Sequence, residues 1–81
     1  MNIKPENTVY DDGVRDRLSK FKEDYMFLLR EIAAILKVSL RTVQRRCHDG
    51  KLAYLKVERA VRVSRSALLE YIETYLVVGK A

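Results

Sequence analysis

The side chains best suited to molecular recognition lie between Ser39 and His48. As a helix, this segment would turn a set of hydrogen-bonding side chains outward, namely Arg41, Thr42, Gln44, Arg45, Arg46 and His48. The segment contains no Asp or Glu, although exposed helices usually mix acids with bases. In the major groove of DNA, arginine can hold guanine and glutamine can hold adenine, each through two hydrogen bonds. The segment therefore has the chemistry to read a major groove; an ordinary solvated helix face is the alternative.

The placement of charge supports the same interpretation. The net charge of the 81-residue chain is +5. Residues 39–65 carry eight Lys or Arg against two acids, whereas residues 1–38 carry seven of each kind. A local excess makes a positive field that attracts a polyanion, while evenly spread cations would favour only solubility. A basic face without any partner is the alternative.

Two short helices joined by a tight turn would position these side chains. The first helix is indicated by apolar residues at helical spacing, which are Leu29, Ile32, Ala33 and Leu36. Ser39 suits the N-cap of the second helix, because its hydroxyl can accept from a free backbone N–H. Gly50 can adopt the left-handed conformation that ends many helices. With Val43 and Cys47 turned inward, residues 28–48 are expected to form a helix-turn-helix.

After this unit the apolar pattern changes from helical to alternating, which predicts a β-hairpin, or wing, within residues 53–63. Its apolar side chains are expected to face the core and its cations to face solvent. The inward set is Leu55, Val57, Val61 and Val63, and the outward set is Lys56 and Arg62. A turn near Glu58 places Arg59 at the tip, where a cation could enter a minor groove. A solvated loop tip is the alternative for Arg59.

These elements suggest one way of docking on DNA. The second helix would enter a major groove, and Arg59 would reach the neighbouring minor groove. Backbone phosphates would be contacted from the same surface by Ser39, Arg46, Lys51, Lys56 and Arg62. Contacts of this kind release counterions, so the affinity is expected to fall steeply with salt.

The remaining segments are expected to complete a single domain over residues 11–78, since a chain of this length supports one small core. Residues 1–10 are predicted to be a flexible leader. An extra N-terminal helix, capped by Asp11 or Asp12, would bury a face made by Val14, Leu18, Phe21 and Tyr25. A short extended stretch over residues 25–27 would lead into the helix-turn-helix.

A last helix is predicted over about 65–77, with Ser64 as its cap. Its inward side chains would be Leu68, Tyr71, Ile72 and Tyr75. The apolar end, residues 75–78, would either pack on the domain or join another subunit. We therefore expect self-association on DNA, head to tail or as a dimer, through this end or the N-terminal helix.

Enzymatic chemistry is not indicated. Cys47 and His48 are adjacent, so on a helix their side chains point about 100° apart, which suits a nucleophile and its base poorly. No Gly-rich phosphate loop, HExxH or CxxC motif occurs, and no cofactor or metal is expected. Single-stranded or RNA binding is disfavoured, because no aromatic ring lies among the arginines. A pure protein-interaction module would leave the basic helix unused.

The cellular location is expected to be the cytoplasm of a prokaryotic or phage-infected cell, at the nucleoid. No apolar run approaches the roughly 20 residues of a membrane span, and the N-terminus lacks the plan of a secretory signal. The single cysteine cannot form an internal disulfide. Neither a membrane nor a small-molecule effector is expected as a partner.

The stretch from Phe27 to about Leu76 resembles the MerR-like winged-helix domain of the excisionase family, the recombination directionality factors. The resemblance rests on the order and spacing of REIAAIL, VSLRTVQRRC, DGKL and VRVSRSALLEYI. It implies a mainly α fold with a small hairpin wing, and a protein that binds repeated sites, bends DNA and helps a tyrosine recombinase excise an integrated element. It also implies groove contacts by Arg41, Thr42, Gln44, Arg45 and His48, with Arg59 in the minor groove.

Three positions depart from this family pattern. Leu28 stands where a Ser or Thr cap is usual, Arg46 replaces a large apolar residue, and the wing turn lacks a glycine. The same domain pattern also serves transcriptional regulators and plasmid-maintenance proteins, and the fold alone cannot choose among these functions.

Overall fold

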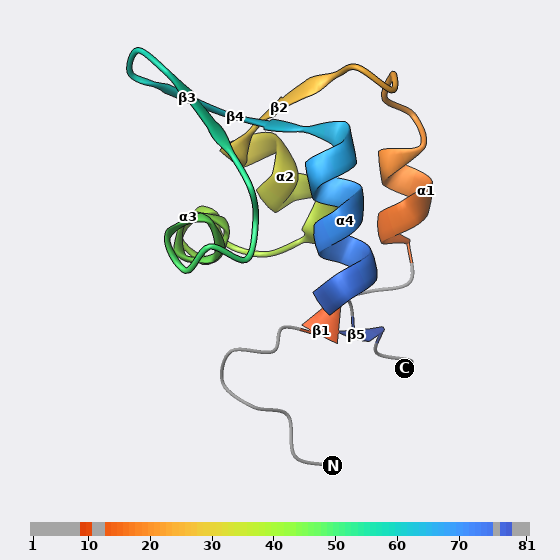
Figure 1. The fold of residues 1–81 in the computed structure, drawn as a ribbon. Coiled ribbons are helices and arrows are strands. Elements are labelled where there is room, and N and C mark those ends of the chain that lie inside the picture. The colour runs from red at the N-terminus through yellow and green to blue at the C-terminus, as the bar shows by residue number, and fades with distance from the viewer. Residues whose placement is uncertain (1–8, 11–12, 76, 79–81) are drawn as a thin grey trace.

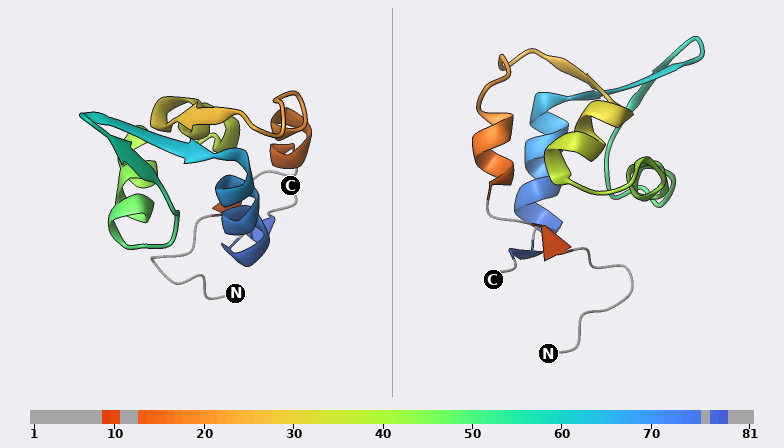
Figure 2. Two further views of the ribbon diagram at one scale, coloured as in Figure 1. Left: turned by 45° about the horizontal axis from the view of Figure 1, so that its top comes forward. Right: turned by 180° about the vertical axis from the view of Figure 1, so that it is seen from behind.

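The computed structural model describes residues 9–10, 13–75 and 77–78 (Figure 1). Its elements are, in order, β1 (Val9–Tyr10), α1 (Val14–Leu18), β2 (Met26–Leu28), α2 (Leu29–Leu36), α3 (Leu40–His48), β3 (Leu55–Val57), β4 (Ala60–Ser64), α4 (Arg65–Tyr75) and β5 (Val77–Val78). Three strands form an antiparallel sheet in the order β2-β4-β3, and β1 pairs with β5 in parallel. Helices α2, α3 and α4 lie on one side of the three-stranded sheet (Figures 1 and 2).

The predicted helix-turn-helix is confirmed as α2 and α3. Lys37 adopts the left-handed conformation, with φ of 55°, where the chain leaves α2. Ser39 then caps α3, because its hydroxyl oxygen accepts from the backbone N–H of Thr42 at 3.1 Å. Gly50, with φ of 79°, turns the chain away just after α3. These local signals fix the start and the end of the second helix.

The core lies between the sheet and the helices. Phe27 of β2 and Val63 of β4 are cross-strand partners, and both are fully buried. The predicted inward residues of α2, α3 and α4 join them, including Ile32, Leu36, Val43, Cys47, Leu68, Tyr71 and Ile72. Arg17 of α1 donates from Nε to the carbonyl of Ile35 at 2.8 Å, which ties α1 to the end of α2. The helix-turn-helix therefore packs into the core through α2 and α3 and is also tied to α1 through Arg17.

The register of the hairpin overturns the predicted facing of β3. Lys56 lies opposite Val61, and directly opposed residues of an antiparallel pair share one face of the sheet. Val63, two residues beyond Val61, is buried, so Lys56 lies on the core-facing side. Leu55 and Val57 lie on the other side and are 57% and 60% exposed. The prediction that they face the core is wrong, because a shift of one residue reverses every side chain of a strand.

α1 is shorter than predicted. It ends at Leu18, and a tight turn follows in which the Phe21 N–H donates to the Leu18 carbonyl at 3.1 Å. Phe21 and Tyr25 therefore leave the helix, and their rings pack on Phe27 with centroids 4.8 Å apart. Gly13 is the N-cap, without a side-chain hydrogen bond. The proposed caps at positions 11 and 12 lie outside the described residues.

The two ends of the described chain meet. Val9 pairs with Val77 and Tyr10 with Val78, so the last two residues of the predicted leader form a short strand. Residues 1–8 and Leu76 lie outside the described part of the chain.

The cap of α4 is confirmed, since the Ser64 hydroxyl accepts from the Ala67 N–H at 3.1 Å. Tyr75 was predicted to point inward, but it is 39% exposed. Its ring packs at a tilt against the Tyr71 ring at the end of the helix, with centroids 5.3 Å apart. The last turn of α4 therefore extends beyond the core.

Candidate nucleic-acid interface

One side of α3 is exposed and carries four of the five predicted major-groove residues. Arg41, Gln44, Arg45 and His48 are all exposed, and we call them the recognition face. At about 100° of turn per residue, their positions fall within about 100° of the helix circumference. Val43 lies on the opposite side and is buried. The recognition face thus presents two guanidinium groups, an amide and an imidazole to solvent, and no acid.

Thr42, the fifth predicted contact, lies at the edge of this face and is half-buried. Its hydroxyl is 2.8 Å from the hydroxyl of Ser39, which also accepts from the Thr42 backbone N–H. Ser39, predicted to contact phosphate, is exposed at the N-terminus of α3. Both hydroxyls therefore serve the start of α3, and their contacts with DNA stay predictions.

Arg46 differs from the other cations of α3, because it is buried, with only 6% of its surface exposed. Its Nη1 lies 3.9 Å from Oδ2 of Asp49, and it lines an apolar recess together with Val43 and Tyr71. The prediction that Arg46 points outward to a phosphate is wrong. Each residue along a helix is rotated by about 100° from the one before it. Arg45 faces solvent, and this rotation places Arg46 toward the core.

The β3–β4 hairpin carries three further predicted contacts. Arg59 is exposed in the two-residue turn, as predicted for the tip. Glu58 takes the left-handed conformation there, with φ of 57°, so the turn forms without a glycine. Lys56 is exposed on the side that faces α3. Arg62 lies opposite Leu55, on the hairpin face turned away from α3. It is half-buried, and its Nη1 donates to the carbonyl of Val61 at 3.2 Å.

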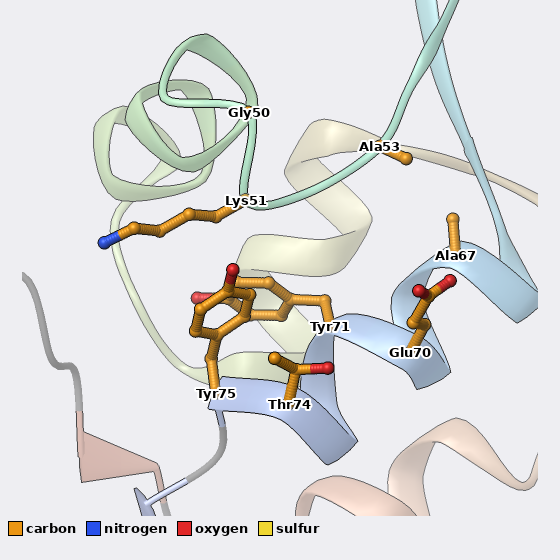
Figure 3. Close-up of a pocket in the computed structure, with 8 residues that line it drawn as sticks. All are labelled: Gly50, Lys51, Ala53, Ala67, Glu70, Tyr71, Thr74 and Tyr75. Carbon is orange, nitrogen blue, oxygen red and sulfur yellow. The ribbon is translucent and has the colours of Figure 1, made fainter.

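Lys51, another predicted phosphate contact, turns toward α4. Its Nζ lies 5.8 Å from the centroid of the Tyr75 ring, which is a cation–π contact (Figure 3). The two residues border a surface pocket of about 210 Å³ that Glu70 and Thr74 also line. A phosphate contact by Lys51 would require its ammonium group to leave this ring.

The recognition face and the hairpin border a common hollow of about 270 Å³. Gln44 and His48 line it from α3, and Lys56 lines it from β3. Tyr54, which is 48% exposed, also lines it, although Tyr54 is not among the residues predicted from the sequence to contact DNA. The available signal was weak: one aromatic residue between the helix-turn-helix and the first strand.

A hydrogen-bond network holds the start of α2. The carboxylate of Glu31 accepts from the Leu28 backbone N–H at 2.8 Å and from the Tyr25 hydroxyl at 2.6 Å. The Leu28 bond first and the Tyr25 bond second hold the pKa of Glu31 below its ordinary value, and the charges of Arg30 and Arg62 act in the same direction. The bond to Glu31 raises the pKa of Tyr25. Glu31 therefore supplies a cap that the side chain of Leu28 cannot supply.

The two residues considered for catalysis, Cys47 and His48, differ in exposure. Cys47 is buried, and burial raises the pKa of its thiol, whereas His48 is exposed on the recognition face. Over residues 9–10, 13–75 and 77–78, no three His, Cys, Asp or Glu side chains lie close enough to hold a metal ion. Within the same ranges, no helix has the length and apolar character needed to cross a membrane.

Comparison with known proteins agrees with this geometry. A family described as "Helix-turn-helix domain" matches residues 29–75, which run from α2 to the end of α4. Two proteins of Mycobacterium tuberculosis, from strains CDC 1551 / Oshkosh and ATCC 25618 / H37Rv, each carry the name "Putative DNA-binding protein" and are 37% identical over 49 residues. The match covers 60% of this chain and 63% of each relative, so the chain spans less than two thirds of their length. No solved structure matches the chain significantly.

Proposed function

Because this chain belongs to the helix-turn-helix domain family, we propose that it binds double-stranded DNA at specific sequences, with the recognition face of α3 in a major groove. In this docking Arg41 and Arg45 bind guanine edges, and Gln44 binds an adenine edge. The hairpin lies over the neighbouring minor groove, with Arg59 at its entrance. Phosphates are contacted by Ser39, Lys51, Lys56 and Arg62, whereas Arg46 has no part in binding.

The observation that carries this proposal is the division of α3 into two sides. The recognition face is exposed and free of acids, while Val43, Arg46 and Cys47 anchor the opposite side in the core. A helix anchored in this way can enter a groove while its contacts with the protein core stay intact. Its side chains are of the types that distinguish base edges in the major groove.

We further propose that the chain is an excisionase-like factor, which bends DNA at repeated sites and directs a tyrosine recombinase toward excision. The support is the resemblance of residues 27–76 to that family. Its four motifs fall on α2, on α3, on the turn that follows α3, and on β4 together with α4. A recognition helix and a hairpin on one side of the molecule favour bending, because they engage adjacent grooves of the same duplex. Neighbouring copies are proposed to cooperate, since one domain offers a small contact area.

The second candidate is a small transcriptional regulator of a mobile element, or a plasmid-maintenance protein. The same domain supports it equally well, because a helix-turn-helix does not dictate the biological consequence of binding. The two candidates differ in the arrangement of their sites. Copies of an excisionase line up on direct repeats, whereas a dimeric repressor binds a palindrome that mirrors its own two-fold symmetry.

Footprinting of the full chain on the DNA flanking its own gene tests the proposal. Protection of direct repeats beside a recombinase attachment site, with gel mobility that depends on the position of the site in the fragment, would support excision and bending. Protection of one palindrome over a promoter would instead support the regulator. Equal affinity for every duplex, with no protected sequence, would contradict specific binding.

A further inference from the structure

The hollow between α3 and the β3–β4 hairpin has an apolar floor and a polar rim. Cys47 and Val61 contribute to its floor, and both carry little or no capacity for hydrogen bonding through their side chains. Its rim carries the exposed side chains of Gln44, His48, Tyr54 and Lys56. The rim therefore offers an amide, an imidazole, a phenolic hydroxyl and an ammonium group around one space of about 270 Å³.

The strand register makes this arrangement possible. Lys56 lies opposite Val61, so its side chain shares the face of the hairpin that continues into the buried Val63. The hairpin extends past the core at this point, and Lys56 consequently faces α3 across the hollow. Had β3 kept the facing predicted from the sequence, Leu55 would occupy this side and Lys56 would point away from α3.

The charge of the hollow is positive. No Asp or Glu is among the residues that line it, and Lys56 is its only formally charged member at neutral pH when His48 is neutral. An ammonium group on a largely apolar floor, with three neutral polar groups beside it, suits a single tetrahedral anion with several acceptor oxygens. An apolar or cationic occupant would bring no negative charge to pair with the ammonium group of Lys56.

We propose that the hollow seats one phosphate of the DNA strand that separates the two grooves, an inference that rests on the proposed function. Lys56 pairs with the charge of the phosphate, and the Tyr54 hydroxyl and the His48 imidazole donate hydrogen bonds to its oxygens. If α3 occupies a major groove and the hairpin the adjacent minor groove, one phosphate backbone must pass between them. The hollow is the space that the described residues leave for this backbone. Tyr54 is thereby assigned as a positioning residue that sets the distance between helix and hairpin on DNA.

The test compares the salt dependence of duplex binding for single variants of the full chain. Lys56→Met should reduce the slope of log affinity against log salt by about 1, because one phosphate is no longer neutralised. Tyr54→Phe should weaken binding about 3- to 10-fold and leave the slope unchanged, because a neutral hydrogen bond releases no counterion. The double variant should lose less than the product of the two single losses, since both side chains hold the same phosphate.

Two control variants separate this seat from general effects. Lys22→Met removes an exposed lysine from the segment between α1 and β2. Tyr75→Phe removes an exposed hydroxyl outside the hollow and keeps the ring that Lys51 contacts. Neither control should change the affinity beyond about 2-fold. Normal binding by Tyr54→Phe, or fully independent effects of the two hollow variants, would overturn the seat and leave DNA binding intact. Failure of the unaltered chain to bind any duplex would overturn the proposed function itself, and the seat with it.

Discussion

Arg45 and Arg46 are neighbours in the sequence, but Arg45 faces solvent and Arg46 faces the core. Arg45 is exposed on the recognition face, whereas Arg46 is buried beside Val43 and pairs with Asp49. Two arginines with the same formal charge therefore have different physical roles. Arg45 presents its guanidinium group to solvent, and Arg46 contributes its aliphatic stem to the packing of the helix-turn-helix.

Alanine substitutions should separate these two roles. Arg45→Ala should weaken binding to the specific site by about 1–3 kcal/mol, relax sequence preference and leave stability unchanged within about 0.5 kcal/mol. Arg46→Ala should lower the free energy of unfolding by about 1–3 kcal/mol, because loss of the aliphatic part of Arg46 leaves a cavity beside Val43 and Tyr71. Urea denaturation and a binding titration of each variant measure both quantities. Equal losses by Arg45→Ala on specific and random duplexes would contradict its role in base recognition.

Ser39 should control the stability of α3 through its hydroxyl. Ser39→Ala removes the acceptor for the Thr42 N–H and should lower the free energy of unfolding by about 0.5–2 kcal/mol. Ser39→Asp keeps an acceptor at the cap and should retain stability, while its negative charge should weaken binding to DNA at low salt. Denaturation and binding assays on this pair distinguish capping from contact. A Ser39→Ala protein of unchanged stability would show that the observed hydrogen bond contributes nothing.

Glu31 should make stability depend on pH in acid. Because its folded pKa is lowered, its contribution is fully present above the ordinary value of 4.5 and is lost as the pH falls through the depressed folded pKa. Glu31→Gln should remove this part of the pH dependence and, at neutral pH, cost about 1 kcal/mol of capping energy. Thermal melts from about pH 7 down to about pH 3 give the comparison. Parallel pH profiles for the two proteins would contradict a capping role for the carboxylate.

The facing of β3 can be tested by comparing exposed and buried apolar residues. Leu55→Thr and Val57→Thr should change the free energy of unfolding by less than about 0.5 kcal/mol, because both side chains already face solvent. Val63→Ala in β4 should cost about 1–3 kcal/mol, because Val63 is fully buried against Phe27. Comparable losses in all three variants would restore the facing expected from the alternating sequence pattern.

The helix-turn-helix could be predicted because its signals are local. The spacing of Leu29, Ile32 and Leu36, the serine at the cap and the glycine beyond α3 each act within one or two helical turns. The exposed set on α3 followed from the same periodicity. The prediction that Arg46 points outward is based on its charge and not on its position along the helix. Helical geometry places position 46 on the core side.

The hairpin and the ends of the chain could not be predicted to the same degree, because they depend on distant partners. The register against β4 determines whether Leu55 or Lys56 faces α3. The alternating sequence pattern is the same for both orientations of the strand and cannot choose between them. The pairing of β1 with β5 joins residues almost 70 positions apart, for which the sequence carries no local signal. Tyr54 was missed for the same reason, since only the folded chain brings it beside His48.

The most direct test of DNA binding by α3 is the affinity for a duplex after charge reversal on the recognition face. Fluorescence anisotropy should compare the unaltered full chain with Arg41→Glu/Arg45→Glu on a short duplex at low salt, after circular dichroism has shown that both are folded. The double variant is expected to bind at least about 30-fold more weakly, because two groove contacts are lost and two negative charges face the duplex. Equal affinities for the two folded proteins would contradict the assignment of this face to DNA.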